Sequence, residues 1–194
     1  MKAATQARTL KTRARLIEAA QQVIAESGYS ETRVEEIVRR AGVAKGTFFA
    51  HFRDKDALMD QLIGARIDAL LDGMEARQAP DTVEALIDAL TPLMQLMTCE
   101  RYVFDVIIRH SGAAAKEEIG PIAMTFGRFI DVVSRWMRAE NIRKDAAPEI
   151  LAEGVQAFMV NAMALNFCAL HNDSTVEDRL RPYLELWLFP QGKD

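Results

Sequence analysis

The chain has 194 residues, of which 49% are hydrophobic and 27% are charged. This balance is typical of a globular protein with a buried core, and no apolar run approaches the roughly 18 residues that a membrane span requires. No apolar stretch follows the basic residues at the N-terminus, so we expect no signal peptide and a cytoplasmic protein without membrane contact. Cys99 and Cys168 stand far apart, which argues against a disulfide framework or a zinc site.

The net charge of −4 hides an asymmetry along the chain. Residues 1–56 hold 11 Lys and Arg against 7 Asp and Glu, a charge of +4, whereas residues 57–194 hold 13 against 21, a charge of −8. A basic segment joined to an acidic remainder is expected if only the first part meets phosphate. An excess of this size also arises by chance, so charge alone leaves the choice open.

Apolar residues recur at three- and four-residue steps throughout the chain, and the period-2 alternation of strands is absent. The pattern predicts an all-α fold of about nine helices. In chain order these span residues 9–27, 33–40, 45–52, 54–77, 82–98, 100–110, 121–140, 148–171 and 175–189. Gly28 is expected to end the first helix, and Pro92 predicts a kink or a break inside the fifth.

Several predicted helices begin at residues that favour N-caps. Thr32 and Glu35 have the spacing of a capping box, in which the Thr32 side chain accepts from the N–H of Glu35. Asp54 is expected to cap the long fourth helix. The segments 81–84 and 174–177 also fit caps, the second as a capping box.

The segment 28–58 predicts two short helices joined by a tight turn at Gly42, where the absence of a Cβ permits the sharp bend. The second helix opens on residues 45–47, two short side chains beside a cation. Such a helix end can approach phosphates and base edges in a DNA major groove. Phe48 and Phe52 are expected to pack into the core of this helix-turn-helix.

The same segment closely resembles the N-terminal signature of the tetracycline-repressor (TetR) family of transcriptional regulators. The resemblance covers about residues 8–60. The residues that match at the family's spacing are Gly28, Tyr29, Thr32, Val34, Ile37, Ala41, Gly42, Val43, Lys45, Gly46, Thr47, His51, Phe52, Lys55 and Leu58. It implies a helix-turn-helix DNA-binding domain over residues 1–56 and a helical ligand-binding and dimerisation domain over residues 57–194.

The resemblance also implies roles for individual residues toward DNA: some face the major groove, some bind phosphate, and some place a helix N-terminus against the backbone. The predicted DNA-binding set is Thr32, Arg33, Lys45, Gly46, Thr47, Phe49, His51 and Lys55. Three positions depart from the family's pattern. Ala44 and Arg33 each replace a frequent Ser or Thr, and Phe49 replaces a common Tyr, which changes the expected phosphate contacts.

Other cations near the helix-turn-helix have two interpretations. Arg39 and Arg40 form either a solvated face or part of the DNA contact. The basic residues that precede the motif form either a disordered tail or an arm that reaches DNA, and these residues are Arg8, Lys11, Arg13 and Arg15.

Residues 57–194 are rich in Met and aromatic side chains, which either form an ordinary core or line a pocket for an apolar or aromatic ligand. The candidate ligand-binding residues are Met94, Met97, Phe104, Met124, Phe129, Phe158 and Met163. The two C-terminal helices carry apolar stripes too broad for one buried face, so a four-helix bundle between two subunits is expected, as the resemblance also implies. The candidate dimerisation residues are Phe158, Ala162, Leu165, Tyr183, Leu184 and Trp187.

The sequence thus predicts a ligand-responsive regulator, a repressor, that binds a pseudo-palindromic operator as a homodimer. The resemblance implies that a small apolar or aromatic effector bound in the second domain would release it by shifting helix 54–77. Activation instead of repression stays open, as does a TetR-like fold that has lost operator binding and serves as a protein-interaction module. A small helical enzyme is the third alternative, but the sequence holds no Glu-x-x-His pair, no supported catalytic triad and no phosphate-binding Gly loop. We therefore expect no catalytic residues, no metal and no cofactor.

Overall fold

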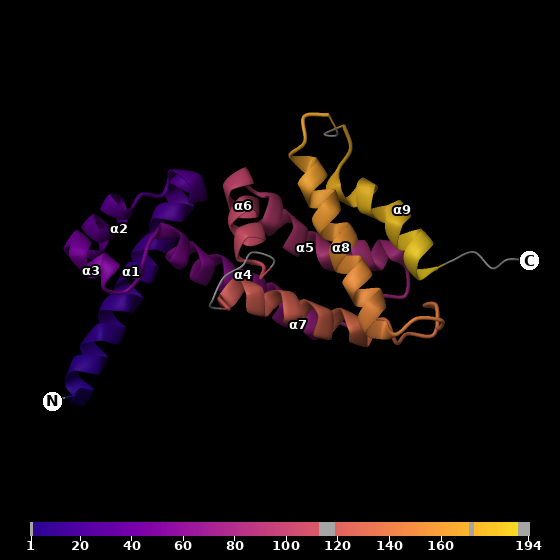
Figure 1. Cartoon of the computed structure of the whole chain (residues 1–194), viewed down its shortest axis with the longest axis horizontal. Helices are drawn as coiled ribbons and strands as arrows, with labels where there is room; N and C mark the ends of the chain where they lie inside the picture. The colour runs from indigo at the N-terminus through magenta and orange to yellow at the C-terminus, as the bar shows by residue number, and fades with distance from the viewer. Residues whose placement is uncertain (1, 113–118, 171–172, 190–194) are drawn as a thin grey trace, which may run out of the picture. The chain divides into compact units, whose positions relative to one another are not determined.

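The computed structural model describes residues 2–112, 119–170 and 173–189, with side chains from residue 6 onward. These residues form nine α-helices and no strand (Figure 1). The helices are α1 (Lys2–Glu31), α2 (Val34–Ala41), α3 (Lys45–Phe49), α4 (Lys55–Glu75), α5 (Val83–Thr98), α6 (Arg101–His110), α7 (Pro121–Trp136), α8 (Pro148–Asn166) and α9 (Val176–Leu188). The all-α prediction is confirmed.

The chain divides into two compact units, Met1–Ile63 and Gly64–Asp194, and α4 contributes to both. In the first unit a stripe on α1 packs against α2, α3 and the start of α4. Its buried core is Leu16, Ala19, Ala20, Val23, Ile37, Val38, Ala41, Phe48, Phe52, Leu58 and Leu62. The core residues of α1 recur at steps of three and four, so they lie on one face of the helix. This face packs against the other helices of the unit.

The first helix begins earlier than its apolar periodicity predicts, at Lys2 instead of residue 9. Residues 2–8 are Ala, Thr, Gln, Lys and Arg, most of which are good helix formers. They have no apolar periodicity, so the sequence pattern does not predict this first part of the helix. Gly28 interrupts α1 with a φ of 84°, as its predicted role at the helix end requires, and helical turns then continue to Glu31.

The predicted capping box at Thr32 is wrong. Arg33 occupies the N-cap of α2 without a side-chain bond, whereas the buried Thr32 hydroxyl donates to the Gly28 carbonyl at 2.7 Å. The kink at Gly28 is the physical reason, because it leaves that carbonyl in need of a donor. Asp54 does cap the fourth helix, since its Oδ1 accepts from the N–H of Ala57 at 2.7 Å.

The caps of α5 and α9 are threonines. Thr82 accepts from the N–H of Ala85 at 3.1 Å, and Thr175 accepts from the N–H of Asp178 at 3.0 Å. The N-cap of α9 therefore lies one residue after Ser174, the first residue of the predicted capping box. Pro92 lies on the exposed side of α5, which continues through it without a break.

In the second unit α8 packs against both α7 and α9, while α5 packs against α6 and α9 (Figure 1). Among the largest side chains fully buried in this unit are Leu90 and Met94 of α5, Ile107 of α6, Ile122 of α7 and Met137 at the C-cap of α7. Three predicted helix ends lie too far along the chain: α3 ends at Phe49, α7 at Trp136 and α8 at Asn166. The predicted end of α8 at residue 171 lies outside the described residues.

Candidate DNA-binding surface and ligand cavity

The turn between α2 and α3 depends on Gly42. Its φ of 62° and ψ of 43° lie in the left-handed region, and its N–H donates to the Arg39 carbonyl at 3.2 Å. The N–H of Val43 donates to the Val38 carbonyl at 3.0 Å, which closes the end of α2. A Cβ at position 42 would lie 3.2 Å from the Arg15 guanidinium, so both conformation and space favour glycine.

On the inner face of α3, Phe48 is fully buried and belongs to the same core cluster as Leu16 and Ala20 of α1. Its ring packs against Phe52 with 5.4 Å between centroids, and the Arg13 guanidinium lies 4.4 Å from the centre of the Phe52 ring. Arg13 also donates to the His51 carbonyl at 2.9 Å. The predicted core role of both phenylalanines is confirmed. Their packing holds α3 in the core of the first unit.

The outer face of α3 is open. Lys45 and Gly46 are exposed, no atom lies within 4 Å of a Cβ built on Gly46, and the Phe49 ring is 48% exposed. Thr47 and His51 are half-buried at the flank of the helix. A short helix that presents small residues and a cation at its first turn can approach a large, flat or grooved partner closely.

Lys45 does not point freely into solvent. Its ammonium lies 2.5 Å from a carboxylate oxygen of Glu35 on α2, and both side chains are more than half exposed. The hydrogen bond from Lys45 holds the pKa of Glu35 below its usual value. Exposed pairs of this kind are weak in water, so an approaching phosphate can replace Glu35 as the partner of Lys45.

The other predicted DNA contacts differ in availability. Thr32 is 1% exposed over its backbone and side chain together, whereas Arg33 is exposed. Lys55 donates to the Ser30 carbonyl at 3.1 Å and thereby ties the start of α4 to the end of α1. Arg39 pairs with Glu36 at 2.5 Å and Arg40 with Glu26 at 2.6 Å, which favours a solvated, internally paired face for these two cations.

A small apolar cavity lies in the second unit between α4, α5, α7 and α8. Its volume is about 20 Å³, room for about one water molecule. It is lined by Ile67, Leu93, Met97, Thr125, Phe126, Phe129, Gln156 and Met159. The polar groups in this wall are used within the protein: the Thr125 hydroxyl donates to the Ile122 carbonyl at 2.6 Å, and the Gln156 amide donates to the Phe126 carbonyl at 3.1 Å.

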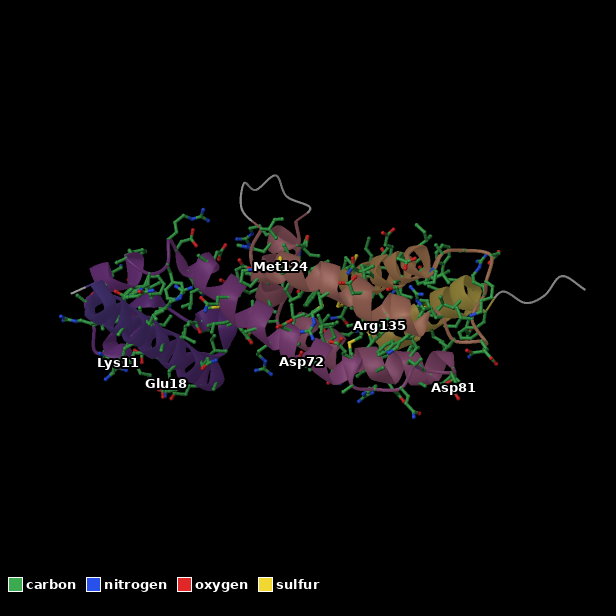
Figure 2. All side chains as sticks on the ribbon, turned by 90° about the horizontal axis from the view of Figure 1, so that it is seen from below. Lys11, Glu18, Asp72, Asp81, Met124 and Arg135 are labelled. Atoms are coloured by element: carbon green, nitrogen blue, oxygen red, sulfur yellow. The ribbon has the colours of Figure 1, made fainter. Side chains whose placement is uncertain are left out.

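Ion pairs join α4 to α7, two of the helices that line the cavity. Arg128 of α7 pairs with Asp68, with Asp72 at 2.5 Å and with Glu75 at 2.9 Å, all on α4. Arg135 pairs with Glu75 at 2.7 Å, and Figure 2 labels Arg135 on α7 and Asp72 on α4. Hydrogen bonds from Arg128 and Arg135 lower the pKa of Glu75, and the network links the two helices across several turns.

The sequence of the helix-turn-helix is similar to those of known proteins. Residues 16–62 match the family described as bacterial regulatory proteins, tetR family. The chain belongs to the TetR family. An uncharacterised helix-turn-helix regulator of Haemophilus influenzae is 24% identical over 95% of this chain and 91% of its own length. The fatty acid metabolism regulator protein of Bacillus subtilis is 37% identical over 31% of each chain.

Among solved structures the TetR-family repressor FadR of Thermus thermophilus, in complex with lauroyl-CoA, shares the fold. Its TM-score is 0.64 at 18% identity, and the match covers 90% of this chain and 92% of FadR. No helix that the structure describes is long and apolar enough to cross a membrane. The described side chains also contain no cluster of three or more His, Cys, Asp or Glu that could hold a metal ion.

In this TetR-family chain only two of the predicted ligand-binding residues, Met97 and Phe129, line the cavity. Met94 and Met163 are buried in the core elsewhere, and Phe104 packs against Phe167 with 5.5 Å between ring centroids. Met124 is 66% exposed on α7 and does not line this cavity. The cavity residues outside the predicted ligand-binding set are Ile67, Leu93, Thr125, Phe126, Gln156 and Met159.

The predicted dimerisation residues divide between an aromatic cluster and the core. Phe158 stacks on Tyr183 at 5.2 Å and meets Trp187 edge-on at 5.8 Å. Ala162 and Leu184 are fully buried within the subunit, where they belong to its core. The helices that carry them, α8 and α9, pack together within one chain.

The apolar surface of α8 and α9 lies next to these buried positions. Leu165 and Trp187 are half-buried, and Tyr183 is exposed. Ile150 and Leu186, which belong to the apolar stripes of these helices but not to the predicted dimerisation set, are 50% and 75% exposed. Large apolar side chains are therefore available on both C-terminal helices.

Proposed function

We propose that this TetR-family protein is a dimeric repressor that binds operator DNA through α3 and leaves it when a small apolar ligand enters the cavity of the second unit. The observation that carries the proposal is the geometry around Gly42. A rigid turn holds α3 against α1 through Phe48 and leaves the opposite face, with Lys45 and Phe49, open. This is the arrangement by which a recognition helix enters a major groove.

Within this proposal each exposed residue of the motif has a distinct part. Lys45 exchanges Glu35 for a phosphate or base edge, and Gly46 lets the backbone come near the groove wall. Thr47 and His51 contact the flanking phosphates from the side of α3. The exposed Phe49 ring makes apolar contact where a tyrosine would add a hydroxyl, for example with thymine methyl groups.

The proposed dimer joins the apolar surfaces of α8 and α9 from two chains. Exposed apolar side chains on both helices support this, since such groups gain stability when a partner covers them. Dimerisation also meets a requirement of specificity. One five-residue recognition helix reads only a few base pairs, and two copies about one turn of DNA apart read a pseudo-palindromic site.

The proposed ligand response starts from the small size of the cavity. A space of about 20 Å³ holds no drug-sized ligand, so a ligand must displace side chains from the wall. Met97 and Met159 are suited to this because methionine is unbranched and flexible. Since Ile67 brings α4 into the same wall, a ligand that occupies this space would move α4 against α7, and the Arg128 pairs would resist that movement.

An acyl chain is the proposed class of ligand. It is apolar and thin, which fits a wall whose polar groups are already bonded within the protein. The complex of FadR with lauroyl-CoA, a protein of the same fold, supports this choice and supplies the first probe.

We expect lauroyl-CoA to raise the dissociation constant of an operator selected from random DNA, as measured by fluorescence anisotropy. Met97→Ala should lower the concentration that releases half of the DNA by about 5- to 10-fold, because less of the wall must be displaced. Met94→Ala is the matched control, since it removes an equally buried methionine of α5 that does not line the cavity. Equal effects of the two substitutions would refute the assignment of the cavity, and DNA binding that never responds to lauroyl-CoA would refute the acyl class.

A further inference from the structure

A second concave surface lies in the first unit, between the N-terminal half of α1 and the helix-turn-helix. The groove has a volume of about 570 Å³. One wall is formed by Arg8, Lys11 and Arg15 of α1, and the other contains Ala44, Thr47 and His51. The groove therefore begins beside the first turn of α3 and follows α1 away from it.

The charge of this groove has one sign. Positions 8, 11 and 15 recur at the three- and four-residue steps that place side chains on one face of a helix. No acidic residue lines the groove, and the first carboxylate along the sequence is Glu18, beyond Lys11 on α1 (Figure 2). The arginines of α2 are different, because Arg39 and Arg40 pair with nearby glutamates.

Of the three cations Arg8, Lys11 and Arg15, which form a basic stripe on α1, Arg15 lies closest to the turn at Gly42. Its guanidinium donates to the carbonyl of Ala41, directly before the turn at Gly42. From Arg15 to Arg8 the helix rises about 10 Å at 1.5 Å per residue. Duplex DNA carries one negative charge per about 1.7 Å of its axis, so a stripe of this length spans several phosphates.

We propose that Arg8, Lys11 and Arg15 bind backbone phosphates of the same duplex that α3 contacts, which makes the N-terminal half of α1 part of the DNA-binding surface. The proposal rests on the proposed DNA binding by α3. Thr47 and His51 belong both to the flank of α3 and to the groove, so a duplex seated on α3 continues directly along it. This surface also supplies phosphate contacts next to Ala44, whose side chain has no oxygen or nitrogen to offer.

The test uses the double variant Arg8→Gln/Lys11→Gln in the full chain, with Arg15 left in place because it supports the turn. Affinity for a selected operator is measured by fluorescence anisotropy over a series of salt concentrations. Each phosphate contact contributes about 0.9 to the slope of log K against log salt. A dimer that loses four contacts should therefore show a slope smaller by about 3 to 4.

The affinity itself should fall at least tenfold, and by a similar factor for operator and unrelated duplex, because phosphate contacts carry no sequence information. The matched control is Arg66→Gln/Arg77→Gln, which removes the same charge from exposed positions of the second unit and should leave the slope unchanged. If the wild type binds the operator but the α1 variant keeps its slope, the inference about α1 is wrong while DNA binding by α3 stands. If no selected duplex binds the wild type, the proposed function fails.

Discussion

Phe48→Ala is expected to lower the free energy of unfolding of the first unit by about 3–5 kcal/mol and to abolish operator binding at 25 °C. Phe48 is 0% exposed and joins α3 to α1 and to Phe52. Alanine would leave a void in a core built from short helices, which have little other support. Chemical denaturation followed by circular dichroism measures the loss of stability, and anisotropy measures the loss of binding.

The neighbouring Phe49 provides the control for this experiment. Its ring is 48% exposed and touches Phe48 edge-on with 5.3 Å between centroids, so Phe49→Ala should cost about 1 kcal/mol of stability at most. We expect this variant to fold and to bind the operator more weakly. If Phe48→Ala retained full DNA affinity, the burial of Phe48 would not be what holds α3 in position for DNA binding.

Gly64→Ala is expected to destabilise the second unit by about 1–3 kcal/mol, although alanine is the better helix former. Gly64 is buried in α4, and a Cβ there would lie 2.7 Å from the Cβ of Pro121 and 3.0 Å from the backbone nitrogen of Ile122. The backbone at the start of α7 cannot move aside as a side chain can. Differential scanning calorimetry should show a lower midpoint of thermal unfolding.

Gly73→Ala is the matched substitution in the same helix. Gly73 is exposed and no atom lies within 4 Å of its ideal Cβ, so alanine there should stabilise the protein by about 0.5–1 kcal/mol. The two changes are chemically identical and are expected to have opposite signs. Stabilisation by both would mean that α4 and α7 do not approach each other at Gly64 as closely as the structure shows.

The helix-turn-helix was predictable because its determinants are local. Gly42, Phe48 and Phe52 act within a few residues of one another, and their spacing alone indicates a turn and a packed face. The capping box predicted at Thr32 does not form, because Gly28 takes a φ of 84° while the helix resumes beyond it, and the Gly28 carbonyl accepts from the Thr32 hydroxyl instead. The residue types alone do not indicate that the Thr32 hydroxyl would bond to the Gly28 carbonyl and not to the N–H of Glu35.

The cavity could not be assigned from the sequence for a different reason. Met94 and Met97 lie on the same helix and are both buried, yet only Met97 reaches the cavity. Which of them does so depends on how α5 is rotated against α4, α7 and α8, and that rotation follows from packing over the whole unit. The same holds for Ala162 and Leu184, whose apolar character suits a subunit core and a dimer interface equally.

The central claim is that α3 reads DNA, and the most direct test is binding of wild type and Lys45→Ala to a selected operator and to a scrambled duplex of equal length. Fluorescence anisotropy at fixed salt gives the dissociation constants. The account predicts that the wild type prefers the operator and that Lys45→Ala, an exposed change that leaves the fold intact, weakens operator binding by about 1–3 kcal/mol. Equal binding of the two duplexes, or an operator affinity that Lys45→Ala leaves unchanged, would contradict it.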